Sequence, residues 1–304
     1  MTRNTEQPSE GTERTRVLHA VSSATITLTD AGLPSARVDA ELLAAHVLDV
    51  PRGQLAIAAG FTSEQLTAYR SLVARRAAGE PVQHLIGSAP FRYLELAVGP
   101  GVFVPRPETE LLAGWGIQGS GPAPVVVDLC SGSGAIALAV AQEVPGATVY
   151  AVERSPAALE WLRRNASGTG VTVVAGDASD PAVLAELDGR VDLVLCNPPY
   201  VPAGAPVPAD VADHDPEDAV FAGPDGLAVI RPVIARAAAL LRGGGRFGVE
   251  HDDTHGDAVP ALLRADGRFT EVMDHQDLAG RPRFATASRS LAIGHGRLTP
   301  RDAL

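Results

Sequence analysis

The sequence predicts an α/β protein with a doubly wound, mostly parallel sheet that follows a small helical domain. From about residue 124 onward, β-prone apolar segments alternate with helical ones. The first of these strands runs into a glycine-rich turn, and the chain before residue 83 shows only helical periodicity. Strands that are separated by helices pair in parallel, because each helix carries the chain back along the sheet.

Composition narrows the class of protein. The chain has 304 residues, a net charge of −11 and no lysine, and 45% of its residues are apolar but only 4% aromatic. It has no basic run along which a phosphate backbone could lie, which counts against a dedicated nucleic-acid binder. Two cysteines are too few for a disulfide framework, and the polar N-terminus resembles no signal peptide. No run of 18 apolar residues is present, so we expect no membrane partner. Together these features lead us to expect a soluble cytoplasmic monomer that does not bind nucleic acid.

The same patterns divide the chain into four parts. We expect a disordered tail over 1–12, a helical domain over 13–82, a β-hairpin linker over 83–110 and the doubly wound domain over 111–304. Within the helical part, Thr62 or Ser63 can cap a third helix. In the linker, β-prone pieces at 91–98 and 102–104 flank Gly99–Gly101, which predicts the turn of the hairpin there.

The doubly wound part contains seven segments that read as strands. They cover residues 124–130, 148–153, 171–177, 191–196, 246–250, 269–275 and 283–288. Helices are expected from residue 135 and over 157–164, 227–241 and 258–264. The strand at 191–196 is apolar without clean alternation, as expected where both faces of a parallel sheet are covered.

The glycine-rich turn after the first strand has the pattern Asp128-x-x-x-Gly132-x-Gly134. Glycines let the backbone approach a ligand closely, and the helix N-terminus behind them favours a carboxylate or a phosphate. The turn is therefore predicted to bind a nucleotide-type cofactor. It also fits the dinucleotide fingerprint, so by itself it does not choose between cofactors.

Two acidic residues follow the next strands. Glu153 ends the second strand, where a carboxylate can accept both hydroxyls of a ribose in NAD enzymes and S-adenosylmethionine enzymes alike. Asp177 ends the third strand and can accept from an adenine amino group, with Ala178 lining that face. The alternative for each acid is a solvated carboxylate at the end of a strand.

The strand at 191–196 runs directly into Asn197-Pro198-Pro199-Tyr200. The prolines end the strand and hold Asn197 at its carboxyl end, where open α/β sheets bind their ligands. The carbonyl oxygens of the Asn197 side chain and of Pro198 can accept both N–H bonds of a planar amine or amide, which leaves the nitrogen facing an electrophile.

A dehydrogenase has no need of such a clamp, whereas methyl transfer to a weakly nucleophilic nitrogen does. The tetrad thus favours a methyltransferase, with Tyr200 packed on the planar substrate group. As alternatives, Asn-Pro is a common turn opener, and Tyr200 can be an ordinary core aromatic.

Two further features are weaker indications of function. His251 and His255 stand at i, i+4 spacing, which can hold a metal, but they follow a strand and no third ligand is evident. We expect no metal. Cys196 precedes Asn197, but no histidine partner is placed by the sequence, so a small buried thiol is the better interpretation.

In order along the chain, these motifs resemble those of bacterial glutamine methyltransferases of peptide chain release factors. The matching blocks are residues 36–43, 75–87, 103–110, the glycine-rich turn, the NPPY tetrad and residues 277–283. The tetrad is also similar to that of amino-group DNA methyltransferases. The resemblance implies a class I S-adenosylmethionine-dependent domain, with an antiparallel last strand, behind a helical substrate-recognition domain. It implies methylation of the glutamine of a Gly-Gly-Gln motif in release factors, with S-adenosylhomocysteine as product.

The resemblance and the motifs together assign roles to residues. The expected catalytic residues are Asn197, Pro198, Pro199 and Tyr200. The expected cofactor site consists of Asp128, Cys130, Ser131, Gly132, Ser133, Gly134, Glu153, Asp177, Ala178 and Asn197. The resemblance also places Phe103 and Arg106 near the substrate pocket.

The chain departs from the family pattern at several positions. Cys130 stands where many members have glycine, Glu153 replaces the commoner aspartate, and Ala178 stands where some members have an aromatic residue. The segment from Glu250 to His255 does not match the family motif there, so it receives no role. Alternative functions are methylation of a ribosomal-protein glutamine or of a DNA adenine amino group, and a non-catalytic dinucleotide- or adenosine-binding module.

Overall fold

The computed structural model describes residues 10–291, which fold into two compact units. The first unit comprises residues 10–89, 97–104 and 206–215, and the second comprises the remainder of the described chain. Of the tail that we expected to be disordered, residues 1–9 lie outside the described residues, and helix α1 occupies Glu10–Asp30.

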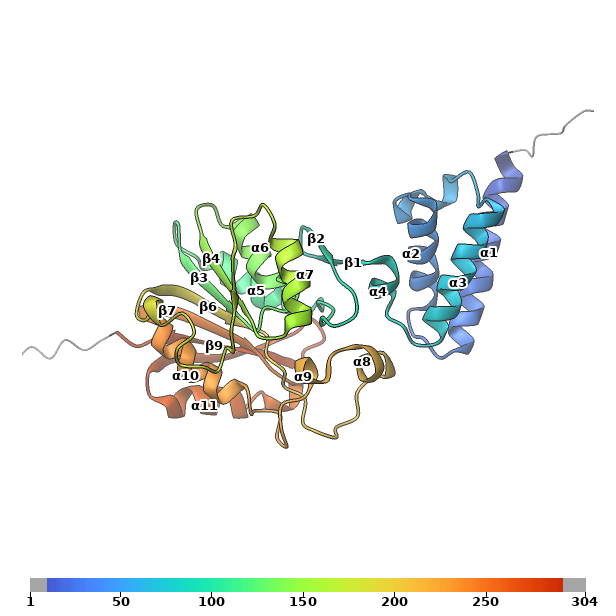
Figure 1. Ribbon diagram of the computed structural model, residues 1–304. Helices are drawn as coiled ribbons and strands as arrows, with labels where there is room; N and C mark the ends of the chain where they lie inside the picture. The colour runs from blue at the N-terminus through green and yellow to red at the C-terminus, as the bar shows by residue number, and fades with distance from the viewer. Residues whose placement is uncertain (1–9, 292–304) are drawn as a thin grey trace, which may run out of the picture. The chain divides into compact units, whose positions relative to one another are not determined.

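The first unit is helical, as its periodicity predicts. Its helices are α1, α2 (Ala36–Leu48), the 3-10 helix η1 (Arg52–Ile57), α3 (Ser63–Ala77), α4 (Val82–Ile86) and α8 (Ala209–His214) (Figure 1). Thr62 caps α3 through a capping box, in which its hydroxyl accepts from the Gln65 N–H and the Gln65 side chain accepts from the Thr62 N–H. The helix therefore begins where two of its orphan N–H groups find partners.

A buried ion pair stands inside this helical core. Arg76 Nε of α3 lies 2.7 Å from Asp39 Oδ2 of α2, and both side chains are at most 6% exposed. Apolar residues of α1, α2 and α3 form the core of the same unit, among them Leu28 and Leu43. The Tyr69 hydroxyl donates to the carbonyl of Ala40 at 3.0 Å. Two helices are thus joined by polar contacts within an apolar core.

Asp39→Ala is expected to destabilise this unit by about 3–5 kcal/mol, because it leaves the Arg76 guanidinium buried without its counter-ion. Glu41→Ala is the matched control, since it breaks more exposed pairs with Arg37 and Arg52 and is expected to cost about 1 kcal/mol or less. Urea unfolding followed by circular dichroism measures both values. Equal losses of stability would contradict a structural role for the buried pair.

The hairpin near residue 90 does not turn where we expected. Strands β1 (Ser88–Phe91) and β2 (Leu94–Ala97) pair with each other, so the turn lies at Arg92–Tyr93, and the prediction of a turn at Gly99–Gly101 is wrong. The backbone of Arg92 has a left-handed conformation, with φ of 53°. Its N–H donates to Glu110 Oε1 and its guanidinium pairs with Glu143, so contacts distant in the sequence hold the turn in place.

The second unit is an α/β domain built on a seven-stranded sheet (Figure 1). Its strands are β3 (Val125–Leu129), β4 (Thr148–Glu153), β5 (Thr172–Ala175), β6 (Val191–Cys196), β7 (Leu241–Glu250), β8 (Phe269–Gln276) and β9 (Pro282–Arg289). Their spatial order is β5-β4-β3-β6-β7-β9-β8. The strands from β5 to β7 in this order pair in parallel, whereas β9 is antiparallel to β7 and β8. The predicted doubly wound sheet with an antiparallel last strand is confirmed.

Helices cover both faces of this sheet. They are α5 (Thr109–Gln118), α6 (Ala135–Glu143), α7 (Pro156–Ala166), α9 (Glu217–Val220), α10 (Ile230–Leu240) and α11 (Ala258–Asp266), with 3-10 turns η2 (Ala185–Leu187) and η3 (Asp253–His255). Helices α5, α6 and α7 contribute to one core and α10 and α11 to the other. None of the helices between residues 10 and 291 is both long enough and apolar enough to cross a membrane.

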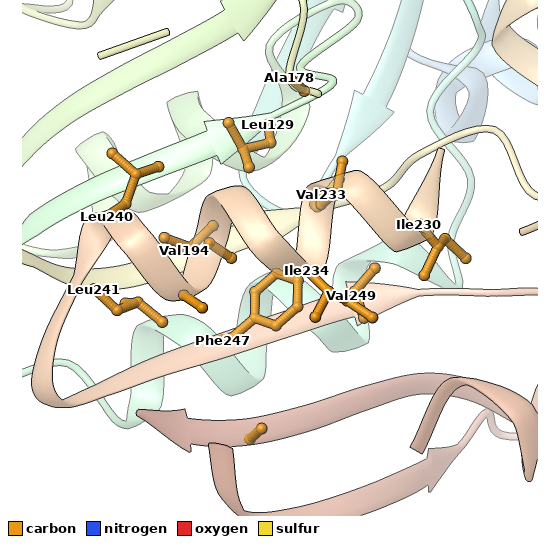
Figure 2. Close-up of a cluster of buried hydrophobic side chains, with 14 of the residues drawn as sticks. Leu129, Ala178, Val194, Ile230, Val233, Ile234, Leu240, Leu241, Phe247 and Val249 are labelled. Atoms are coloured by element: carbon orange, nitrogen blue, oxygen red, sulfur yellow. The ribbon is translucent and has the colours of Figure 1, made fainter. Parts of the chain in front are cut away.

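Burial of both faces of strand β6 accounts for its apolar sequence. Leu193 and Leu195 point into the core beneath α5 to α7, while Val194 and Cys196 point into the core beneath α10. All four side chains are at most 2% exposed. Figure 2 shows the second core, where α10 lies along the strands with Ile234 in the cluster. A strand buried on both faces needs apolar residues on both, and only the partly exposed Asp192 departs from this pattern in β6.

Two strands differ from their predicted ranges by more than one residue at an end. Strand β7 begins at Leu241, so the glycines at 243–245 lie inside it, beside a shift in register between Val191 and Leu193 of β6. Strand β5 ends at Ala175, so Asp177 lies in the turn beyond it. In both cases the strand boundary lies within a few residues of the expected one.

Candidate active site

The glycine-rich turn joins β3 to α6 and requires left-handed backbone at three positions. Cys130, Gly132 and Gly134 have φ of 60°, 56° and 92°. At Gly134 an added Cβ would lie 2.7 Å from Leu162 Cδ1, so glycine lets α6 pack against α7. At Gly132 an added Cβ would meet nothing within 4 Å, so open space borders the turn there. Cys130 does tolerate a Cβ, in a conformation that L residues adopt at a cost.

Asp128 is fully buried and organises this turn from within. Its Oδ2 accepts from the Ser131 hydroxyl at 2.5 Å and from the Ala137 N–H of α6 at 3.1 Å. Among the residues that the structure describes, its Oδ1 has no hydrogen-bond partner. Burial raises the pKa of Asp128 to about 7, although these hydrogen bonds oppose the shift. The contacts that Asp128 makes thus join the turn to α6.

Glu153 ends β4 and binds the neighbouring backbone. Its Oε2 accepts from the Gly132 N–H at 2.8 Å. Its Oε1 accepts from the N–H groups of Arg154 and Ser155 at 2.8 and 2.7 Å. Each oxygen of a carboxylate offers two lone pairs, so Glu153 retains one acceptor position, on Oε2, toward a ligand. The side chain therefore lies against the turn, and its assignment to the ribose stays a prediction.

Asp177 and Ala178 lie in the turn after β5. Asp177 Oδ1 accepts from the N–H and hydroxyl of Ser179, at 2.8 and 2.6 Å, and these bonds lower the pKa of Asp177. Its Oδ2 lies 3.6 Å from the guanidinium of Arg154, a residue that we did not single out from the sequence. Ala178 is buried in the core beneath α10. Both residues thus stand beyond the carboxyl end of the sheet.

The NPPY tetrad leaves the sheet at the end of β6. Pro198 and Pro199 are buried, whereas Asn197 and Tyr200 are partly exposed. Asn197 Nδ2 donates to the hydroxyl of Thr109, the first residue of α5, at 3.1 Å. An amide nitrogen that is engaged in this way leaves the amide oxygen available as an acceptor.

A buried acid lies beneath the tetrad. Glu250, the last residue of β7, is 1% exposed and accepts from the Tyr200 hydroxyl at 3.1 Å. Burial raises the pKa of Glu250 to about 7, while the hydroxyls of Thr109 and Tyr200 and the charge of Arg283 oppose the shift. We assigned neither Thr109 nor Glu250 a role from the sequence, although Thr109 lies in a block that carries the family resemblance.

The chain after the tetrad returns to pack against it. The N–H of Val201 donates to the carbonyl of Val220, and Val201 forms a parallel bridge with Phe221. Gly226 has φ of 72°, and an added Cβ would lie 2.3 Å from the carbonyl oxygen of Tyr200. The position of Tyr200 thus depends on a glycine that was not predicted to contribute to the site.

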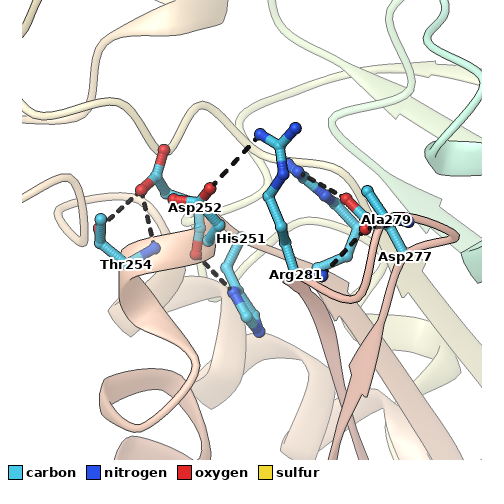
Figure 3. Close-up of polar contacts among 8 residues, drawn as sticks. His251, Asp252, Thr254, Asp277, Ala279 and Arg281 are labelled. Carbon is cyan, nitrogen blue, oxygen red and sulfur yellow. Dashed lines mark hydrogen bonds and ion pairs between the residues drawn. The ribbon is translucent and has the colours of Figure 1, made fainter.

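His251 makes hydrogen bonds of its own with neighbouring residues. His251 is buried between the Asp252 carbonyl oxygen and Asp274 Oδ1, each 2.9 Å from a ring nitrogen, and burial lowers its pKa. Asp252 accepts from the N–H and hydroxyl of Thr254. Figure 3 shows this segment beside the turn that joins β8 to β9. Across the described part of the chain, no group of three or more His, Cys, Asp or Glu residues stands close enough to hold a metal.

That β8–β9 turn contains the last block of the family resemblance. Asp277 Oδ1 accepts from the N–H groups of Ala279 and Arg281, and its Oδ2 accepts from Arg283 Nη2 at 3.1 Å (Figure 3). Arg283 in turn acts electrostatically on Tyr200 and Glu250. The turn therefore orients a cation toward the underside of the tetrad.

The remaining residues that we singled out from the sequence are distributed over the two units. Cys196 is buried, and its pKa is raised by burial and by the adjacent thiol of Cys130. Both thiols are free. Phe103 belongs to the first unit and Arg106 to the second, so only Arg106 shares a unit with the tetrad. Their assignment to the substrate pocket stays a prediction.

These contacts bring together the carboxyl ends of β3, β4, β6 and β7. The sheet order and the antiparallel last strand, with a glycine-rich turn after β3 and NPPY after β6, define a class I methyltransferase domain. Two family models match the chain: the PrmC N-terminal domain over residues 19–87 and the methyltransferase small domain over residues 117–213.

Known proteins resemble the chain over most of its length. A release factor glutamine methyltransferase of Mycolicibacterium smegmatis is 55% identical over 276 residues, which are 90% of this chain and 98% of that protein. One of Streptomyces coelicolor is 50% identical, over 90% of this chain and 99% of that protein. The chain belongs to the family of release factor glutamine methyltransferases. Family and fold together imply the use of S-adenosylmethionine.

A relative with a different name is similar over a somewhat smaller part of the chain. A 4-amino-L-phenylalanine/4-methylamino-L-phenylalanine methyltransferase of Streptomyces pristinaespiralis is 43% identical, over 83% of this chain and 89% of that protein. Its named substrates carry an amino group on an aromatic ring. The relatives therefore include a protein named for a small molecule as well as those named for release factors.

Gly226→Ala is expected to lower both stability and activity, because the new methyl group must displace the Tyr200 carbonyl. Gly189→Ala is the control, since Gly189 also has positive φ, 71°, but its added Cβ would meet nothing within 4 Å. We expect Gly226→Ala to cost about 1–3 kcal/mol more than the control. Thermal unfolding of the two variants measures the difference, and equal costs would show that only backbone strain matters.

Glu250→Gln tests the cost of burying the acid. Burial raises the folded-state pKa from 4.5 to about 7, so Glu250 contributes stability that is complete below pH 4.5 and lost as the pH rises through 7. The Tm of the variant minus that of the unchanged protein should be larger at pH 8 than at pH 5, by the equivalent of about 3 kcal/mol at most. Glu160→Gln, on the exposed face of α7, controls for the loss of one charge. A difference that does not change with pH would contradict the raised pKa.

Proposed function

We propose that this protein transfers a methyl group from S-adenosylmethionine to the side-chain amide nitrogen of the glutamine in the Gly-Gly-Gln motif of peptide chain release factors. The observation that carries the proposal is the placement of Asn197 beside the glycine-rich turn, with its amide nitrogen engaged by Thr109. Family membership supports the substrate class.

The cofactor assignment is supported by the fit of the turn. Open space borders Gly132, and the Gly132 N–H donates to Glu153, whose Oε2 retains one acceptor position for a ribose hydroxyl. In the proposed site the turn from Cys130 to Gly134, with Asp128 beneath it, would hold the methionine part of the cofactor. Asp177 and Ala178 would face the adenine.

The amide clamp addresses the weak nucleophilicity of an amide. The nitrogen of a primary amide shares its lone pair with the carbonyl, so it must be aligned closely before it reacts. The oxygens of the Asn197 side chain and of Pro198 would accept its two N–H bonds and direct its π face. As positive charge develops on that nitrogen, both oxygens would stabilise it.

Atoms and charge balance without a strong base. Bound S-adenosylmethionine supplies a methyl group on a sulfonium, and a new N–C bond forms as the C–S bond breaks, with the electron pair left on sulfur. The methylated nitrogen then releases a proton to water. In this proposal Tyr200, anchored on Glu250, packs against the planar substrate group.

The proposal also includes the setting of the enzyme. We expect a cytoplasmic monomer whose partners are release factors, without direct binding of nucleic acid. The net charge of −11 and the absence of lysine support the last point. Because one relative is named for an aromatic amine, 4-amino-L-phenylalanine is an informative competing substrate for the same clamp.

Asn197→Ala is expected to reduce methyl transfer by at least about 100-fold, because one of the two acceptors of the clamp is lost. The measurement is incorporation of labelled methyl groups from S-adenosylmethionine into a purified release factor. The control is calorimetric titration of the variant with S-adenosylmethionine, which should still bind. Retained transfer would contradict the clamp, and preferred methylation of 4-amino-L-phenylalanine by the unchanged protein would replace the proposed substrate.

A further inference from the structure

A buried hydroxyl connects the clamp to the buried acid. Thr109 is 3% exposed, and its Oγ accepts from Asn197 Nδ2 at 3.1 Å. The same hydroxyl is hydrogen-bonded to the carboxylate of Glu250, which is 1% exposed, and this contact opposes the rise that burial causes in the pKa of Glu250. Tyr200 donates to Glu250 Oε1 from the other end of the tetrad. Both ends of NPPY thus rest on one buried carboxylate.

When Glu250 is ionised, the chemistry of these groups permits one direction of hydrogen bonding. An ionised carboxylate only accepts, and a hydroxyl carries one proton. When the Thr109 proton points to Glu250, the hydroxyl can offer Asn197 only a lone pair. The amide of Asn197 must then turn its NH₂ group toward Thr109 and its carbonyl oxygen away from it.

We propose that Thr109 and Glu250 are positioning residues that hold the Asn197 carbonyl toward the substrate, so that the clamp selects an amide over a carboxylate. The inference rests on the proposed function and deepens it. A glutamine side chain brings two N–H donors to the two carbonyl oxygens. A glutamate side chain brings only acceptors, which these oxygens repel.

The hydroxyl is needed because an asparagine side chain can rotate by 180° with little change in shape. In the rotated state its NH₂ group would face the NH₂ group of the substrate, and one acceptor of the clamp would be lost. Only the hydrogen-bonding partners on the protein side distinguish the two states. Removing the Thr109 hydroxyl therefore removes the distinction without changing Asn197.

Thr109→Val keeps the branched shape and deletes the hydroxyl. We expect kcat for release-factor methylation to fall by about tenfold or more, while the Kd for S-adenosylmethionine changes by less than about twofold. Thr109→Ser restores the hydroxyl and should recover most of the lost kcat. Thr286→Val is the matched control, because Thr286 is equally buried, at 4% exposed, and bonds to His275 away from the tetrad.

A second readout reports selectivity directly. A release factor whose Gly-Gly-Gln glutamine is changed to glutamate serves as competitor, and its inhibition constant is compared with the KM of the unchanged release factor. The unchanged enzyme should discriminate strongly between the two, and Thr109→Val should narrow that gap. A loss of packing alone would weaken both interactions to the same extent.

Each outcome bears on the inference. Thr109→Val with a kcat close to that of Thr286→Val would overturn it, as would Thr109→Ser being as impaired as Thr109→Val. An unchanged gap between glutamine and glutamate would also overturn it. If the unchanged protein binds S-adenosylmethionine but methylates no release factor, the proposed function fails and this inference fails with it.

Discussion

Strands β3 and β6 pair in parallel with Leu129 opposite Cys196, so Cys130 and Asn197 leave the sheet at the same edge. This register brings the turn that would hold a methyl donor next to the residue that would hold its acceptor. The two strands lie at the point where the chain order of the sheet reverses, which is where open α/β sheets bind ligands. A shift by one residue would exchange the two faces of β6, both of which are buried.

Around that edge, buried carboxylates hold the turn and the tetrad in place through hydrogen bonds. Asp128 joins the turn to α6, and Glu153 joins the turn to the end of β4. Glu250 supports Tyr200 from below. Burial raises the pKa of both Asp128 and Glu250 to about 7. Fixed acceptors at the edge of a sheet suit a reaction that needs alignment and charge stabilisation more than it needs a strong base.

The sequence was sufficient for the sheet and for the tetrad, because both depend on local patterns. Alternation of strands with helices predicts the fold, and two prolines after an apolar strand predict where Asn197 lies. Contacts between residues that are distant in the sequence could not be predicted from it. Asn197 and Thr109 are 88 residues apart, and Tyr200 and Glu250 are 50 apart. No spacing rule connects such pairs.

Helix starts and turns likewise differ in whether neighbouring residues or distant contacts determine them. The capped start of α3 at Thr62 follows from neighbouring residues, and it was predicted. The hairpin turn at Arg92 was not, because Arg92 depends on Glu110 and Glu143 rather than on glycine or proline. His251 and His255 have a spacing that suits a metal, but burial beside Asp274 gives the first of them a structural role.

The central claim is that the acceptor is a glutamine amide nitrogen held at Asn197. The most direct test is fragmentation mass spectrometry of a release factor after incubation with this protein and methyl-deuterated S-adenosylmethionine. The account predicts one labelled methyl group, on the side-chain nitrogen of the Gly-Gly-Gln glutamine. A label on any other atom of the release factor, or none while the cofactor is bound, would contradict it.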